Sequence, residues 1–97
     1  MKINRKILTA FIGYLKNSGH GIKERHGCLV FRKAAKDVII NCIDEDDLSI
    51  NPYGYQLYMR FMHSWLNMGK SFIRKMQNLG TIIIIRLKGK NHLECWK

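Results

Sequence analysis

Histidines next to basic residues are the side chains of this 97-residue chain that could carry out acid–base chemistry. RNA can be cleaved without a metal by a general base, a general acid and a cation near the phosphate. His20 or His26, with Lys23 or Arg25 as the cation, would supply these groups. The hydrolase and nucleotide-binding motifs Gly-x-Ser-x-Gly, His-Glu-x-x-His and the phosphate-binding glycine loop do not occur in the sequence. We therefore expect a non-enzymatic protein and keep a ribonuclease as an alternative.

Two pairs of soft ligands raise the question of a zinc site. His26 lies two residues before Cys28, His92 lies three before Cys95, and Cys42 is a fifth candidate. Structural zinc usually takes four ligands in tight pairs of similar spacing, and these pairs differ. Cys28 also opens an apolar run, which is typical of a small buried residue. We expect no metal and no cofactor, and the odd number of cysteines favours reduced thiols in the cytoplasm.

An acidic run, Asp44 to Asp47, could hold a magnesium ion or share a proton between carboxylates. Magnesium sites normally gather one or two carboxylates from separate elements, whereas consecutive side chains in a loop diverge. The run is therefore expected to be a solvated turn.

Charge is unevenly distributed along the chain. There are 17 Lys and Arg against 7 Asp and Glu, and five of the seven acids lie between Asp37 and Asp47. Residues 48–93 contain seven basic residues and no acidic one. A surface built from such segments favours polyanions, with nucleic acid ahead of an anionic membrane or an acidic protein. The longest aliphatic run, Ile82 to Ile85, is far shorter than the ~20 residues of a membrane span.

The sequence therefore predicts a nucleic-acid-binding protein that contacts phosphates. The expected contact residues are the basic side chains of the first strands and of the later elements: Lys23, Arg25, Arg32, Lys33, Lys70, Arg74, Lys75, Arg86, Lys88 and Lys90.

The helices and strands expected to position these residues form one α+β domain over residues 1–97. Apolar residues at helical spacing indicate a first helix over 3–15, ended by the Gly-rich segment 17–21. Two apolar strands are expected over 28–33 and 38–43, and they would pair as a hairpin. A polar edge strand over 22–26 would make the sheet three-stranded.

Asn51-Pro52 predicts the start of a long second helix, since asparagine caps a helix and proline fits its first turn. Its buried stripe is expected to include Tyr58, Phe61, Trp65 and Leu66, and in the same phase Phe72 and Met76. The pattern leaves open whether one helix passes through Gly69 or a second helix begins near Ser71. Leu79-Gly80 is expected to end the helix, and the β-branched segment 81–87 predicts a closing β-hairpin with 92–96.

Residues 3–66 resemble the double-stranded-RNA-binding fold in layout, a helix, three antiparallel strands and a helix. Because that fold recognises backbone and shape rather than base edges, the resemblance implies RNA ahead of DNA. Within that fold they are most similar to the small HicA-type toxin ribonucleases. The resemblance rests on the Lys16-Asn-Ser-Gly19 end of the first helix, the basic strand Ile22–His26 and the apolar strand ending in Phe31-Arg32. That family has a catalytic histidine where Cys28 aligns here, and His26 lies two residues earlier.

Two further alternatives concern partners. Small size, a Lys/Ile/Asn-rich composition and the absence of enzyme motifs also fit a phage-type or mobile-element inhibitor that binds an acidic host defence protein. A homodimer is a second open alternative. No secretion signal follows the basic start of the chain, so a cytoplasmic protein without a membrane anchor is expected.

Overall fold

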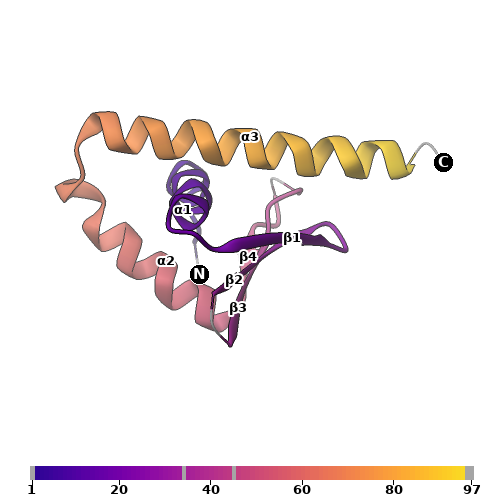
Figure 1. The fold of residues 1–97 in the computed structure, drawn as a ribbon, viewed down its shortest axis with the longest axis horizontal. Coiled ribbons are helices and arrows are strands. Elements are labelled where there is room, and N and C mark those ends of the chain that lie inside the picture. The colour runs from indigo at the N-terminus through magenta and orange to yellow at the C-terminus, as the bar shows by residue number, and fades with distance from the viewer. Residues whose placement is uncertain (1, 34, 45, 96–97) are drawn as a thin grey trace.

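The strands of the chain are consecutive and lie between helices, which is the α+β organisation that the sequence predicts. The computed structural model describes the backbone of residues 2–33, 35–44 and 46–95, and side chains in the same ranges up to residue 89. In chain order the elements are α1 (Arg5–Asn17), β1 (Gly21–Arg25), β2 (Cys28–Lys33), β3 (Lys36–Asn41), β4 (Ser49–Ile50), α2 (Pro52–Ser64), the short 3-10 helix η1 (Trp65–Asn67) and α3 (Lys70–Cys95). In Figure 1, α1 is seen nearly end-on below the long helix α3.

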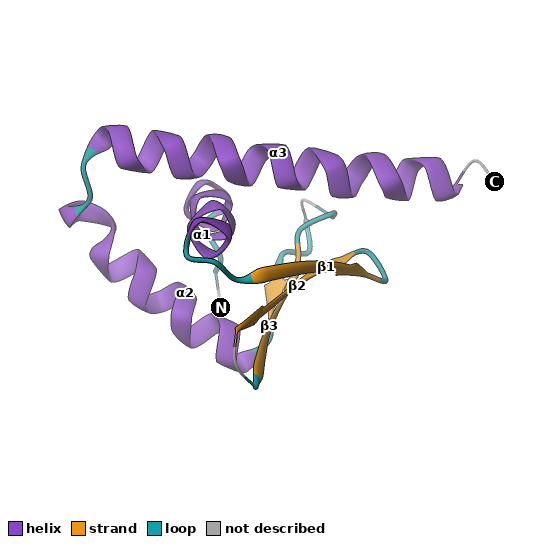
Figure 2. Cartoon of the chain, viewed as in Figure 1, coloured by secondary structure: helices purple, strands orange, loops and turns teal. Residues whose placement is uncertain are grey.

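The four strands form one antiparallel sheet in the order β1-β2-β3-β4. The first connection is a two-residue hairpin in which His26 and Gly27 both have positive φ, 49° and 78°, the backbone that a tight β-hairpin turn needs. Phe31 lies opposite Val38, and Leu29 opposite Ile40, and all four side chains are buried. The helices lie on the side of the sheet that carries these residues (Figure 2). The opposite face, called here the open sheet face, carries Lys23, Arg25, Val30, Arg32 and Ile39.

Helix α1 is buried on two sides. Its large apolar residues Leu8, Phe11, Ile12 and Leu15 belong to the same core cluster as the sheet. Its small residues Ala10 and Gly13 are also buried, and a Cβ added at Gly13 would meet the backbone carbonyl of Met76 in α3. A Cβ added at Gly80 would in turn meet the backbone of Thr9. The two helices therefore cross with their backbones in contact, which only glycine permits.

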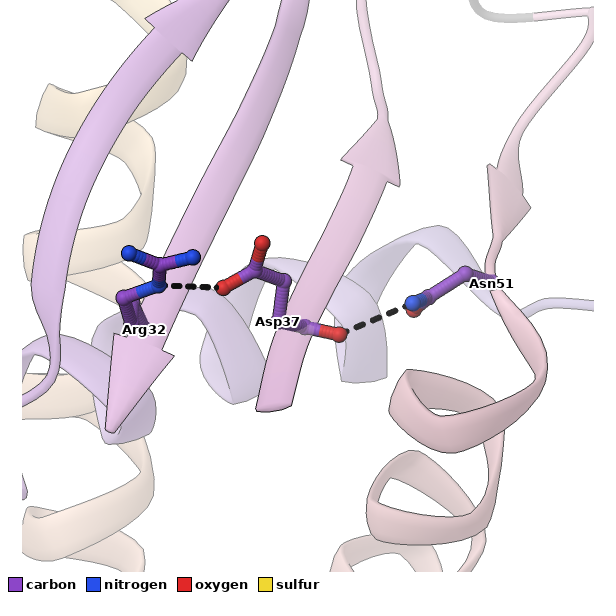
Figure 3. A network of polar contacts seen from close by, with 3 residues as sticks. All are labelled: Arg32, Asp37 and Asn51. Atoms are coloured by element: carbon purple, nitrogen blue, oxygen red, sulfur yellow. Dashed lines mark hydrogen bonds and ion pairs between the residues drawn. The ribbon is translucent and has the colours of Figure 1, made fainter. Parts of the chain in front are cut away.

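Asn51 joins the sheet to α2. Its side-chain oxygen accepts hydrogen bonds from the backbone N–H of Gly54 at 3.1 Å and of Ile39 at 3.0 Å. Its side-chain nitrogen donates to the backbone carbonyl of Asp37 at 2.8 Å (Figure 3). The predicted N-cap is confirmed. Asn51 also completes the hydrogen bonding of β3 where the short strand β4 ends.

The closing β-hairpin predicted over residues 81–96 is wrong, because α3 continues through Gly80 to Cys95. The buried positions of this helix are spaced at i, i+4, i+7, i+8 and i+11, which is a helical period: Met76, Gly80, Ile83, Ile84 and Leu87. The two other isoleucines of the run, Ile82 and Ile85, are 49% and 62% exposed. Packing against α1 outweighs the β preference of isoleucine, which amounts to only a fraction of a kcal/mol per residue, about 0.5.

In the stripe predicted along the second helix, Tyr58, Phe61 and Met76 are buried, but Leu66 and Phe72, which lie between Phe61 and Met76 in the sequence, are not. Helix α2 ends at Ser64, and Met68 is extended after η1, so two helices rather than one pass this region. The change of direction leaves Leu66 92% exposed and Phe72 37% exposed, although both were expected to be buried. Trp65 is half-buried, with its ring centroid 5.9 Å from that of Phe61.

Candidate nucleic-acid interface

The ten basic residues predicted to bind nucleic acid lie in separate places. Lys23, Arg25 and Arg32 line one shallow hollow of the open sheet face, together with Val30 and Asp37. The pleat explains this grouping, since residues two apart on a strand share a face. Arg32 Nε donates to Asp37 Oδ1 at 2.8 Å (Figure 3). This ion pair is exposed, so it adds little stability, but it offsets part of the positive charge of the face.

A second group of cations lies where α3 passes α1. Lys70, Arg74 and Lys75 line one hollow with Ser71 and Asn78. Asn78 also lines a neighbouring hollow, which is formed with α1 and is completed by Arg5, Lys6, Thr9, Gln77 and Thr81. We call the combined surface the basic strip. Among the described residues that line its two hollows, none is acidic.

The sequence places these cations at helix starts. Arg5 and Lys6 lie in the first turn of α1, Lys70 begins α3, and neither first turn contains an acidic residue. The start of a helix carries a partial positive charge, so a cation there is unfavourable by about 0.3 to 1 kcal/mol. The same arrangement favours a bound anion, because backbone N–H groups and basic side chains then act on it together.

The remaining predicted contact residues do not join either surface. Lys33 lines a groove between α1 and α2, and Arg86 is exposed further along α3. Lys88 is half-buried and lies close enough to Cys42 to affect its ionisation. The side chain of Lys90 lies outside the described residues.

The two histidines considered for catalysis are far apart along the sheet. His20 precedes β1 and lines the groove with Lys33, while His26 is exposed at the tip of the β1–β2 hairpin. The five-residue strand between them spans roughly 16 Å at ~3.3 Å per residue. They therefore cannot act on one phosphate as an acid–base pair.

No metal centre forms in the described part of the chain, where no three His, Cys, Asp or Glu side chains come together. Cys28 is half-buried beside the hairpin turn that holds His26, and the side chains of His92 and Cys95 lie outside the described residues. Asp44 caps its own turn by accepting from the backbone N–H of Asp46 at 3.0 Å. This is the local turn bonding typical of aspartate.

Arg5, Lys6 and Arg60 are basic residues that the sequence prediction missed. Arg5 and Lys6 lie in the first turn of α1. The sequence signal that could have identified them is a first helical turn with basic residues and no acidic residue, directly after the capping residue Asn4. Arg60 had no local signal, because it reaches the groove only through the packing of α2 beside α1.

The buried thiol of Cys42 gives a test of the core. Cys42 is 3% exposed, and burial raises the pKa of its thiol from 9.0 to about 11, although Lys88 and Arg5 act in the opposite direction. Because the thiolate is the reactive form, we expect iodoacetamide at pH 8 to modify Cys28 well before Cys42. Mass spectrometry of the alkylated peptides measures this order.

The control for Cys42 is the same reaction in urea, where both thiols should react at similar rates. Equal rates in the native protein would contradict the burial of Cys42. The raised pKa also has a consequence for stability, since the unfolded thiol ionises at a lower pH than the folded one. Between pH 9 and about 11 the contribution of Cys42 to the free energy of unfolding therefore falls as the pH rises.

No protein-family model matches this chain, and neither a curated protein sequence nor a solved structure matches it. The order of elements between Arg5 and Ser64 is the helix, strands and helix predicted for this region. Unrelated proteins share such layouts, so the resemblance to the HicA-type ribonucleases stays a prediction. In the described part of the chain, no helix is both long and apolar enough to span a bilayer.

Proposed function

We propose that this protein binds nucleic acid, RNA ahead of DNA, through phosphate contacts along the basic strip. The observation that carries the proposal is the composition of the strip. It combines basic side chains from α1 and α3 with hydroxyl and amide side chains, and its described lining residues include no carboxylate. Lysine, arginine, serine, threonine and asparagine are the side chains that most often contact phosphates.

The placement of the strip suits an extended polyanion better than a small anion. Lys70, Arg74, Asn78 and Thr81 follow one side of α3. At ~1.5 Å per residue they span about 16 Å of helix, long enough for several successive phosphates. RNA is placed ahead of DNA because the resembled fold recognises backbone and shape rather than base edges. Free thiols at Cys28 and Cys42 fit a cytoplasmic protein.

Neutralising the strip is expected to weaken RNA binding by about tenfold or more. Each phosphate contact that is lost lowers the number of counterions released on binding, and this release favours binding. The variant is the double substitution Lys70→Ala/Arg74→Ala, measured by fluorescence anisotropy with labelled RNA and DNA duplexes. The wild type should show log K falling with log salt at a slope of about −3 to −5, and the variant a slope shallower by about 2.

The matched control is Lys23→Ala/Arg25→Ala, which removes one Lys and one Arg from the open sheet face. It should retain the affinity and most of the salt dependence. If this control loses binding and the strip variant does not, the interface is the sheet face. Salt-independent affinity, or recovery of a discrete acidic protein free of nucleic acid from native lysate, would contradict the proposal and favour a protein-directed inhibitor.

Binding without cleavage is part of the proposal. Total cellular RNA incubated with wild type, His20→Ala or His26→Ala should stay intact in all three reactions when fragment lengths are read on a gel. A true catalytic histidine would contribute about a hundredfold to ten-thousandfold to the rate. Cleavage by the wild type that one of these substitutions abolishes would establish the ribonuclease alternative instead.

A further inference from the structure

A groove separate from the basic strip lies between α1, α2 and the end of β2. Its volume is about 500 Å³, within the range of about 300 to 1,000 Å³ that holds small ligands. Its most informative lining residues are four aromatic side chains, Phe11, Tyr14, Tyr53 and Phe61, and three nitrogen-bearing ones, His20, Lys33 and Arg60.

Phe11, Tyr14 and Phe61 pack together and are called here the aromatic wall. The Phe61 ring lies 5.6 Å from that of Phe11 and 5.1 Å from that of Tyr14, centroid to centroid. Phe11 and Phe61 are buried, whereas Tyr14 is 37% exposed, so part of this cluster is open to solvent. A planar ligand group can stack on such rings, and base stacking is worth about 1 to 3 kcal/mol where measured.

The cations of the groove have no acidic neighbour in it. Lys33 and Arg60 are exposed, and no described aspartate or glutamate lines the groove. The ion pair between Arg32 and Asp37 lies on the open sheet face instead. An anion entering this groove would therefore meet two cations and no repelling carboxylate.

His20 adds an acceptor. Its Nδ1 lies 3.1 Å from the backbone carbonyl of Leu15. A carbonyl only accepts, so Nδ1 carries the proton and Nε2 of the neutral ring is left as an acceptor. A hydroxyl group of a ligand is a suitable donor to it. Ser18 and Ser64 also line the groove. The Ser64 hydroxyl donates to the backbone carbonyl of Arg60 at 3.1 Å, so towards a ligand it acts as an acceptor.

We propose that this groove binds a nucleoside monophosphate unit. The base stacks on the aromatic wall, a ribose hydroxyl donates to His20, and Lys33 and Arg60 bind the phosphate. The unit can be a free nucleotide or an unpaired nucleotide of an RNA, and in the second case the proposal rests on the proposed RNA binding. The groove would then select for unpaired positions, which the phosphate contacts of the strip do not distinguish.

The first experiment is isothermal titration of the whole protein with AMP, adenosine and inorganic phosphate. AMP should bind with a Kd on the order of 10 to 100 μM, and adenosine and phosphate each at least about tenfold more weakly. Trp65 reports the location, since its ring contacts Phe61 at the groove. In a Trp96→Phe background, AMP should quench the remaining tryptophan fluorescence with the same Kd.

Variants assign the binding to the groove. Arg60→Gln should weaken AMP binding by about tenfold and leave adenosine binding unchanged, because it removes a phosphate contact only. Tyr14→Leu should weaken both ligands. The matched control is Arg74→Gln, an exposed arginine of the basic strip, which should leave AMP binding unchanged. Circular dichroism spectra of the variants confirm that each is folded.

The outcomes separate the groove from the strip. Absence of saturable heat with AMP up to about 5 mM, or equal loss in Arg60→Gln and Arg74→Gln, overturns the groove proposal even if RNA binds the strip. AMP binding with no RNA binding overturns only the proposed function and assigns the groove to free nucleotides. An RNA duplex with one bulged adenosine that quenches Trp65, where the fully paired duplex does not, assigns it to unpaired RNA nucleotides.

Discussion

Gly80→Ala is expected to lower the free energy of unfolding by about 3 kcal/mol or more, a large part of the roughly 5 to 15 kcal/mol that holds a domain folded. The added Cβ would meet the carbonyl group of Thr9 in α1. Backbone atoms inside a helix cannot rotate away as a flexible side chain can, so the two helices must separate. Urea denaturation followed by circular dichroism measures the change.

The sign of this effect is decisive, because helix propensity alone predicts the opposite. Alanine is favoured over glycine in a helix by about 1 kcal/mol. Gly89→Ala is the matched control, since Gly89 is exposed in the same helix and no described atom lies within 4 Å of its added Cβ. That variant should be neutral or stabilised by up to about 1 kcal/mol. Equal stability of Gly80→Ala and Gly89→Ala would contradict the close crossing.

Asn51→Ala is expected to lower the free energy of unfolding by about 2 to 4 kcal/mol. The substitution removes an N-cap, worth about 1 kcal/mol, and two further hydrogen bonds to the backbone of β3. The N–H of Ile39 and the carbonyl of Asp37 then lose this partner at the junction of sheet and helix. Thermal and urea unfolding of the variant measure the loss.

Two comparisons isolate the reason for the Asn51 effect. Asn4→Ala removes an N-cap whose side chain accepts one bond, from Ile7, so it should cost only about 1 kcal/mol. Asn51→Asp keeps the capping oxygen but loses the donor to Asp37, so its stability should fall between wild type and Asn51→Ala. An equal cost for Asn4→Ala and Asn51→Ala would show that the link to the sheet contributes nothing.

The elements that the sequence predicted correctly have local signals. Helix α1 has an apolar stripe of large residues, the β2–β3 hairpin has two apolar runs, and α2 begins at an asparagine followed by proline. Helix α3 has signals that conflict, because four consecutive isoleucines favour a strand and Gly80 favours a helix end. Packing against α1 overrides both signals, because α3 approaches the backbone of α1 closely at Thr9 and Gly13, and no hydrophobic pattern reveals this contact.

The candidate site was predictable in its chemistry but not in its arrangement. The charge balance selected Lys70, Arg74 and Lys75 as expected phosphate contacts, and the structure shows that they line one hollow because they share one helix. The sequence could not show that Lys33 lies with Arg60 and His20, because these residues come from three different segments. These three residues line one groove only because α2 packs beside α1, and that packing is determined by the hydrophobic core rather than by any local sequence pattern.

The glycine crossing of α1 and α3 also bears on how the chain folds. Gly13 and Gly80 are 67 positions apart, so their contact closes a loop that includes the whole sheet. Closing so long a loop is entropically costly, and contacts of this kind slow folding. On the ribosome, the strands and α2 are synthesised before α3, so the α1 surface at Thr9 and Gly13 is not covered until α3 has been made. The core between α1 and the sheet therefore lacks one of its covering helices until α3 docks onto α1.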